Sequence, residues 1–132
     1  MATTLIQNKS KARQIIDFSG LRFGNITPTD IDGCIEYKNK ALILFEVKHK
    51  GTAIPKGQEL ALTRIVDNHR AAGKEAVLFI CEHDVEDWRE DIDAATTTVR
   101  KFYWNFEWHD GKDVLLRDKT SRFIKYVDRD KF

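Results

Sequence analysis

Residues 75–81, with the sequence EAVLFIC, form a run that is continuously apolar after its first residue, Glu75. A strand with one face in water alternates apolar and polar residues, so a continuous run is typical of a strand covered on both faces of its sheet. A second, mostly apolar run occupies residues 41–48, and a stretch with a helical pattern separates the two. Two buried strands joined by a helix can lie parallel in one sheet, so the chain is predicted to have an α/β fold.

The helical stretch between these runs carries its own start and stop signals. It opens at Pro55, since proline is favoured in the first turn of a helix. It then places Leu62, Ile65 and Val66 on one apolar stripe. Gly73 stands where a glycine commonly ends a helix. We therefore expect one helix between Pro55 and Gly73.

A second candidate strand precedes the run at residues 41–48. Residues 30–37 alternate polar and apolar side chains, as a strand with two different faces does. Residues 38–40 (KNK) supply turn residues, so the two strands are predicted to form an antiparallel hairpin. A short first helix is expected at residues 10–18.

The C-terminal part is predicted from weaker patterns. We expect an edge strand at residues 91–99 and a helix at residues 121–130. The pair Asp110-Gly111 predicts a hairpin turn between strands at residues 105–109 and 113–117.

Four aromatic residues recur at every second position in this part: Phe102, Trp104, Phe106 and Trp108. Such side chains can stack on unpaired bases, although alternating aromatics more often belong to a core.

The length of 132 residues suits one domain. We expect a single domain over residues 1–132, with a core motif at residues 10–81 and a C-terminal extension at residues 82–132. No apolar run approaches the roughly 20 residues of a membrane span, and the first ten residues lack the apolar centre of a secretory signal. These patterns predict a cytoplasmic protein that does not enter a membrane. Cys34 and Cys81 lie singly in apolar runs without zinc or redox spacing, so both are predicted to be buried thiols.

Charge is distributed unevenly along the chain although the net charge is only +1. Residues 1–80 carry 12 Lys and Arg against 8 Asp and Glu, and residues 81–132 carry 10 against 13. A partner that bears phosphates would be steered towards the basic N-terminal part.

The pair Glu46 and Lys48 interrupts the apolar run of its strand. Residues two apart on a strand point to the same face, so both polar side chains leave the sheet on one side. If the hairpin loop holds three residues, or two plus a bulge, Asp32 lies opposite Glu46 and Asp30 opposite Lys48. The Cβ atoms of Asp32 and Glu46 are then roughly 5 Å apart. Two carboxylates at that distance destabilise a sheet unless a cation lies between them. Oxygen ligands with room for water suit Mg²⁺ or Mn²⁺.

At these residues the chain resembles the PD-(D/E)xK nuclease superfamily, which includes restriction enzymes, Holliday-junction resolvases and phage exonucleases. Asp32 corresponds to the first acidic residue of the motif, and Glu46-Val47-Lys48 reproduces the (D/E)xK tripeptide. Gln58 matches the glutamine of a helical Q-x-x-x-Y pattern, although position 62 is Leu. The resemblance covers about residues 10–81. It implies a restriction-endonuclease-like core, with a mixed sheet of about four to five strands flanked by helices.

The resemblance also implies a divalent-metal-dependent nuclease that hydrolyses phosphodiester bonds. Asp32, Glu46 and the Val47 backbone carbonyl would hold Mg²⁺ or Mn²⁺, and Lys48 and Gln58 would complete the catalytic site. Asp30 shares a face with Asp32 and is the alternative acid. We prefer Asp32 because the neighbouring Gly33 permits close approach. Asp17 is the single candidate for a further acid on the first helix.

Partners and biological role follow from the same interpretation. Lys48, His49, Lys50 and Lys56 form a basic rim that could bind nucleic acid. DNA is the expected substrate, cleaved by a small endonuclease or structure-specific nuclease of recombination, repair or phage origin. A homodimer would be the simplest way to cut two strands. The bacterial or phage-infected cytoplasm is the expected location. The alternative is an inactive nucleic-acid-binding or assembly module on the same fold.

Overall fold

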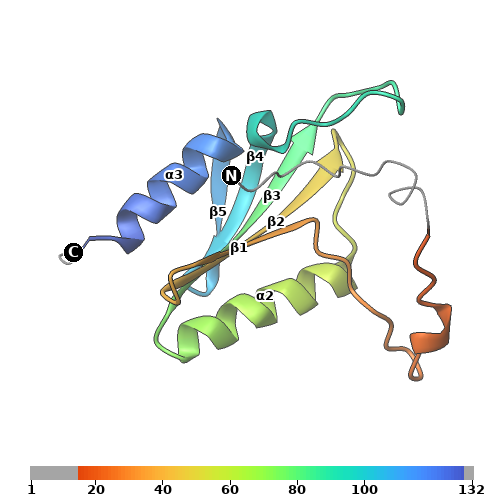
Figure 1. Cartoon of the computed structure of the whole chain (residues 1–132), viewed down its shortest axis with the longest axis horizontal. Coiled ribbons are helices and arrows are strands. Elements are labelled where there is room, and N and C mark those ends of the chain that lie inside the picture. The colour runs from red at the N-terminus through yellow and green to blue at the C-terminus, as the bar shows by residue number, and fades with distance from the viewer. Residues whose placement is uncertain (1–14, 130–132) are drawn as a thin grey trace.

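A computed structural model describes residues 15–129 of the chain. Its centre is a five-stranded mixed sheet with the strands in chain order. The strands are β1 (Gly33–Tyr37), β2 (Ala41–His49), β3 (Glu75–His83), β4 (Thr98–Trp104) and β5 (Glu107–Leu115). The helices are α2 (Lys56–Ala71) and α3 (Leu116–Val127), with two short 3-10 helices, η1 (Ser19–Leu21) and η2 (Ala94–Thr96). The predicted α/β fold, with a mixed sheet flanked by helices, is confirmed (Figure 1).

The predicted parallel pair lies at the centre of the sheet. β2 and β3 run parallel with Ala41 opposite Glu75 and His49 opposite His83, and the other neighbouring strands are antiparallel. α2 makes the crossover between them and begins directly after Pro55. It ends where Gly73 adopts a φ of +87°, a left-handed conformation that glycine takes without strain.

The two helices cover opposite faces of the sheet and define two apolar cores (Figure 1). The core under α2 contains Leu44, Leu62, Val66, Leu78 and Ile80. The core under α3 contains Ile43, Val77, Phe79, Val99 and Leu116. Because side chains alternate along a strand, Glu46 and Lys48 share the face of Leu44 and point to the α2 side.

The predicted hairpin and its register are confirmed. Tyr37 pairs with Ala41 and Gly33 pairs with Phe45, which leaves three residues in the loop. β1 is shorter than predicted, since it begins at Gly33 rather than at residue 30. The strand starts late because the Val47 N–H of β2 donates to the Asp32 side chain, at 2.8 Å from Oδ2. The side-chain oxygen takes the place of a backbone carbonyl in the strand pairing. The same register continued by one residue sets Asp32 opposite Glu46.

The C-terminal hairpin differs from the prediction. Its turn is Asn105-Phe106, both with positive φ (55° and 65°), and not Asp110-Gly111. Gly111 lies within β5, where a Cβ would come within 2.1 Å of the Val99 carbonyl oxygen. The glycine therefore serves the close approach of β4 and β5, and not a turn.

Three other predictions need correction. Residues 91–99 are not an edge strand: the Asp93 side chain caps η2 by accepting the Ala95 N–H at 3.1 Å, and β4 then runs between β3 and β5. The last helix begins at Leu116 rather than at residue 121. Cys34 is exposed on the edge strand β1, whereas Cys81 is buried as predicted.

The N-terminal helix expected at residues 10–18 lies partly outside the described residues. Residues 15–18 are not helical, and the chain forms η1 directly after them. Residues 15–32 then run to β1 without a long regular element, beside the start of α2 (Figure 1). Within residues 15–129, neither helix combines the length and the apolar character needed to cross a membrane.

Candidate active site

Four of the predicted site residues meet at the carboxyl end of β2, on the side of the sheet that α2 covers. Glu46 and Lys48 come from β2, Asp32 from the residues just before β1, and Gln58 from the first turn of α2. The hairpin register brings Asp32 to Glu46, and the crossover brings Gln58 over the same strand end. These positions follow from the strand order, so the site depends on the α/β core rather than on a single loop.

Glu46 is the most unusual residue of this group because it is a charged type with no exposed surface. Gln58 Nε2 donates a hydrogen bond to its Oε1 at 2.9 Å, but Oε2 has no hydrogen-bond partner among the described residues. Burial, and after it the adjacent Asp32, raise the pKa of Glu46 to about 7, although Lys48 opposes the rise. A buried oxygen without a partner costs free energy, so such groups often mark a function or a missing ligand.

Asp32 is held against the same strand end. Its Oδ2 accepts the Val47 N–H at 2.8 Å. The N–H and C=O of one strand residue point to the same edge of the strand, so the Val47 carbonyl also faces the Asp32 side. The structure therefore places all three predicted oxygen ligands, from Asp32, Glu46 and Val47, at one end of β2.

Gln58 connects the site to the chain before β1. Its Nε2 also donates to the backbone carbonyl of Asp30, again at 2.9 Å. One amide group thus fixes the orientation of the Glu46 carboxylate and the position of the segment leading into Asp32. Asp30 itself contributes this carbonyl and lines the adjacent cleft, so the structure leaves its carboxylate as the alternative acid.

The site opens into a cleft of about 730 Å³ between residues 25–32 and the first turns of α2. Asp32, Lys48 and Gln58 line it, as does Arg64. Sequence reasoning missed Arg64. A usable signal was present, since Gln58, Ala61 and Arg64 recur at every third position and so share one face of the helix.

The predicted basic rim is only partly assembled. Lys48 lines the cleft, whereas His49 lies on the other face of β2 and binds Glu86 Oε1 at 3.2 Å. Lys50 lines a separate polar cavity of about 500 Å³ near the end of β3. Lys56 is exposed at the start of α2.

The donor set can be compared with what a divalent cation requires. Within residues 15–129, no group of three or more His, Cys, Asp or Glu side chains is placed to hold a metal ion. Asp32 and Glu46 supply two carboxylates, and the Val47 carbonyl adds a neutral oxygen. Mg²⁺ usually keeps several waters and binds proteins through one or two carboxylates, so this set fits it. The unpartnered Oε2 of Glu46 beside a second carboxylate is the observation that supports the fit.

Comparisons of the chain with family models, with curated proteins and with solved structures found no match. The candidate site therefore rests on its own geometry.

Proposed function

We propose that this chain is a divalent-metal-dependent nuclease of the PD-(D/E)xK type that hydrolyses phosphodiester bonds in DNA. One observation carries the proposal: Glu46 is a fully buried carboxylate with one oxygen unpartnered among the described residues, next to Asp32, beneath a cleft that Lys48 and Gln58 line. A packing role alone gives no reason to bury Glu46 beside a second acid at a strand end, because like charges destabilise each other there.

Each residue has a chemical role in this proposal. Asp32, Glu46 and the Val47 carbonyl would hold Mg²⁺ or Mn²⁺, which when bound would polarise a phosphate and acidify water. Lys48 places a positive charge at the cleft wall, where it stabilises charge that develops on the phosphate. Gln58 holds the Glu46 carboxylate in one orientation through its hydrogen bond, so that this ligand needs no reorganisation.

The proposed substrate is DNA in a particular structure, such as an end or a junction. The described residues give little surface for reading a long base sequence. A homodimer would allow cleavage of two strands. Ile15, Ile16 and Ile26 are exposed by 91%, 75% and 71%, and such apolar surface supports self-association of the N-terminal segment. Recombination, repair or phage replication in the cytoplasm would use such an enzyme.

An inactive nucleic-acid-binding or assembly module is the second candidate. The small acidic donor set favours it, since only two carboxylates meet at the end of β2 among the described residues.

Digestion of linear, circular and branched DNA tests the proposal. We expect cleavage by the parent protein with Mg²⁺, no cleavage with EDTA, and loss of cleavage in Glu46→Gln. Glu90→Gln is the matched control, because Glu90 is an exposed glutamate in the loop after β3. DNA binding without cleavage of any of the three substrates would instead support the inactive module.

A further inference from the structure

A second cavity, of about 230 Å³, lies on the opposite face of the sheet between α3 and strands β3 to β5. Val77 and Phe79 of β3 line it, with further residues from β4, β5 and α3: Phe102, Trp104, His109, Phe123 and Tyr126. Lys119 and Arg122 of α3 complete the lining. The cavity is separated by the sheet from the cleft that contains Lys48.

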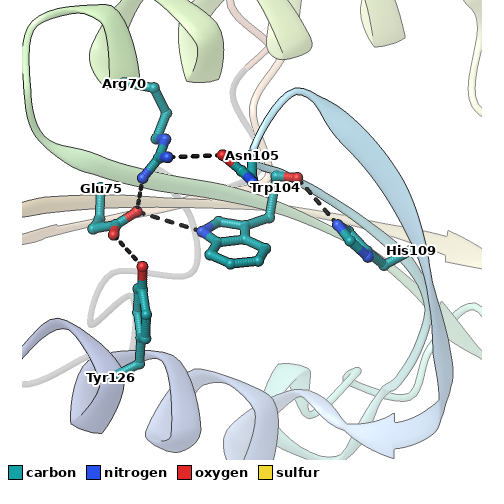
Figure 2. A network of polar contacts seen from close by, with 6 residues as sticks. All are labelled: Arg70, Glu75, Trp104, Asn105, His109 and Tyr126. Carbon is teal, nitrogen blue, oxygen red and sulfur yellow. Dashed lines mark hydrogen bonds and ion pairs between the residues drawn. The ribbon is translucent and has the colours of Figure 1, made fainter. Parts of the chain in front are cut away.

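The aromatic walls of this cavity are held in place by one carboxylate (Figure 2). Glu75 accepts hydrogen bonds from Trp104 Nε1, at 3.4 Å, and from the Tyr126 hydroxyl. Arg70 forms an ion pair with the same carboxylate and donates to Asn105 Oδ1 at 2.9 Å. The Trp104 and Tyr126 rings are therefore held in one orientation by their hydrogen bonds to Glu75. A ligand would not have to order these side chains when it binds.

The remaining wall is a stacked pair of rings. Phe102 and His109 lie opposite each other on β4 and β5, with centroids 5.0 Å apart and planes 18° from parallel. His109 Nε2 donates to the Trp104 carbonyl at 3.1 Å, so the imidazole orientation is also fixed. An aromatic lining of this kind favours an aromatic ligand, because aromatic rings attract one another through edge-to-face as well as stacked contacts.

Two cations of α3, Lys119 and Arg122, place positive charge beside these walls. Lys119 Nζ lies 4.4 Å from the centroid of the Phe102 ring, and Arg122 is exposed on the next turn of α3. Across residues 15–129, no carboxylate comes within ion-pairing distance of either cation. Burial lowers the pKa of Lys119, and the nearby cations Arg122 and Lys112 lower it further. An anion at this position would relieve that repulsion.

The size of the cavity limits what can enter it. Pockets for whole small-molecule ligands are usually about 300–1,000 Å³, so a cavity of about 230 Å³ suits a single ring system while the rest of the ligand stays outside. We infer that this cavity binds a planar aromatic ring carrying an anionic group, either a nucleobase with its phosphate or an aromatic carboxylate. The inference is independent of the proposed nuclease function, because it uses other residues on the other face of the sheet.

NMR titration of the ¹⁵N-labelled protein tests this inference. The probes are deoxyadenosine monophosphate, deoxyadenosine, inorganic phosphate and indole-3-acetate. We expect at least one aromatic anion to shift the Trp104 indole N–H and the amides of α3, with deoxyadenosine and phosphate at least about tenfold weaker. Whether the nucleotide or the carboxylate binds more tightly identifies the source of the ligand.

A pair of arginine variants on α3 provides the matched control. Arg122→Ala should weaken binding of the aromatic anion about tenfold or more, Arg122→Lys should retain most of it, and deoxyadenosine affinity should not change. Arg117→Ala removes the same charge from an exposed position of α3 that does not line this cavity, and should leave binding unchanged. Equal losses in Arg117→Ala and Arg122→Ala would overturn the inference. So would shifts confined to the Gln58 cleft, or no saturable binding of either aromatic anion.

Discussion

Glu46 is the residue on which the proposed site most depends. Its carboxylate lacks exposed surface, has one oxygen without a partner among the described residues, and lies next to Asp32. The sequence predicted the meeting of Asp32 and Glu46 from strand alternation and a three-residue loop, and the hairpin register confirms it. The like-charged neighbour Asp32 contributes, after burial, to the raised pKa of Glu46. Complete burial could not be predicted, because it depends on tertiary contacts such as the hydrogen bond that Gln58 of α2 donates to Glu46.

The pH dependence of stability follows from the raised pKa of Glu46. Its pKa is about 7 in the folded chain and about 4.5 as an ordinary glutamate, so the folded state holds this proton more tightly. Protonation of Glu46 therefore contributes to the free energy of unfolding. This contribution is fully present below pH 4.5 and is lost as the pH rises from there through about 7, by up to about 3 kcal/mol in total. Glu46→Gln does not titrate, so without metal it should gain stability relative to the parent between pH 4.5 and 8.

Urea unfolding in EDTA at pH 4.5, 6 and 8 measures this difference. Mg²⁺ added at pH 8 should stabilise the parent protein and leave Glu46→Gln unchanged, since binding to the folded state alone stabilises it. Parallel stability curves for the two proteins between pH 4.5 and 8 would contradict the raised pKa.

Lys48 should affect catalysis without affecting metal binding. Lys48→Ala keeps all three proposed oxygen ligands and removes a cation from their vicinity, so Mg²⁺ affinity should hold or rise. Cleavage should fall about a hundredfold or more, as when one preorganised charge-stabilising group is removed. Single-turnover cleavage and Mg²⁺ titration measure the two effects separately. Lys125→Ala on α3 is the control; an unchanged rate in Lys48→Ala would exclude a catalytic role for this lysine.

At the scale of elements, the apolar runs and the helix start and stop signals predicted β2, α2 and β3 correctly. The Asp110-Gly111 pair, a strong turn signal, predicted a turn where the chain forms none. Asp-Gly is a common hairpin turn. Gly111, however, lies within β5 at a point where the strand comes very close to the Val99 carbonyl of β4. The turn at Asn105-Phe106 carries a weaker local signal because phenylalanine is unusual at positive φ. Pairing of β4 with β5 decides between the two, and that pairing is not local.

Gly111→Ala tests this explanation. The new Cβ would lie 2.1 Å from a backbone oxygen, so β4 and β5 must move apart and the free energy of unfolding should fall by about 2 kcal/mol or more. Gly57→Ala is the control, since its Cβ meets no atom within 4 Å and alanine is the better helix former. Chemical denaturation of both variants measures the difference; a Gly111→Ala protein as stable as the parent would show that the contact is not tight.

At the scale of the whole molecule, the sheet separates two chemically different faces. The α2 face carries the acidic strand end and its cleft, and the α3 face carries the aromatic cavity with its two cations. The aromatic residues of β4 and β5 divide accordingly: Tyr103 and Trp108 pack towards α2, Phe102 and Trp104 pack towards α3, and Phe106 is exposed at the turn. Neither a core role nor a binding role therefore describes all of them.

The sequence by itself determined the parts of this protein that depend on periodicity and on neighbours in the chain. These are the two buried strands, the helix between Pro55 and Gly73, and the convergence of Asp32 with Glu46 across a short loop. Only the tertiary structure decided which atoms cover Glu46, that Arg64 lines its cleft, and that α3 closes an aromatic cavity behind Glu75. The physical reason is that burial and cavities arise where segments distant in sequence pack together, and no local pattern specifies that packing.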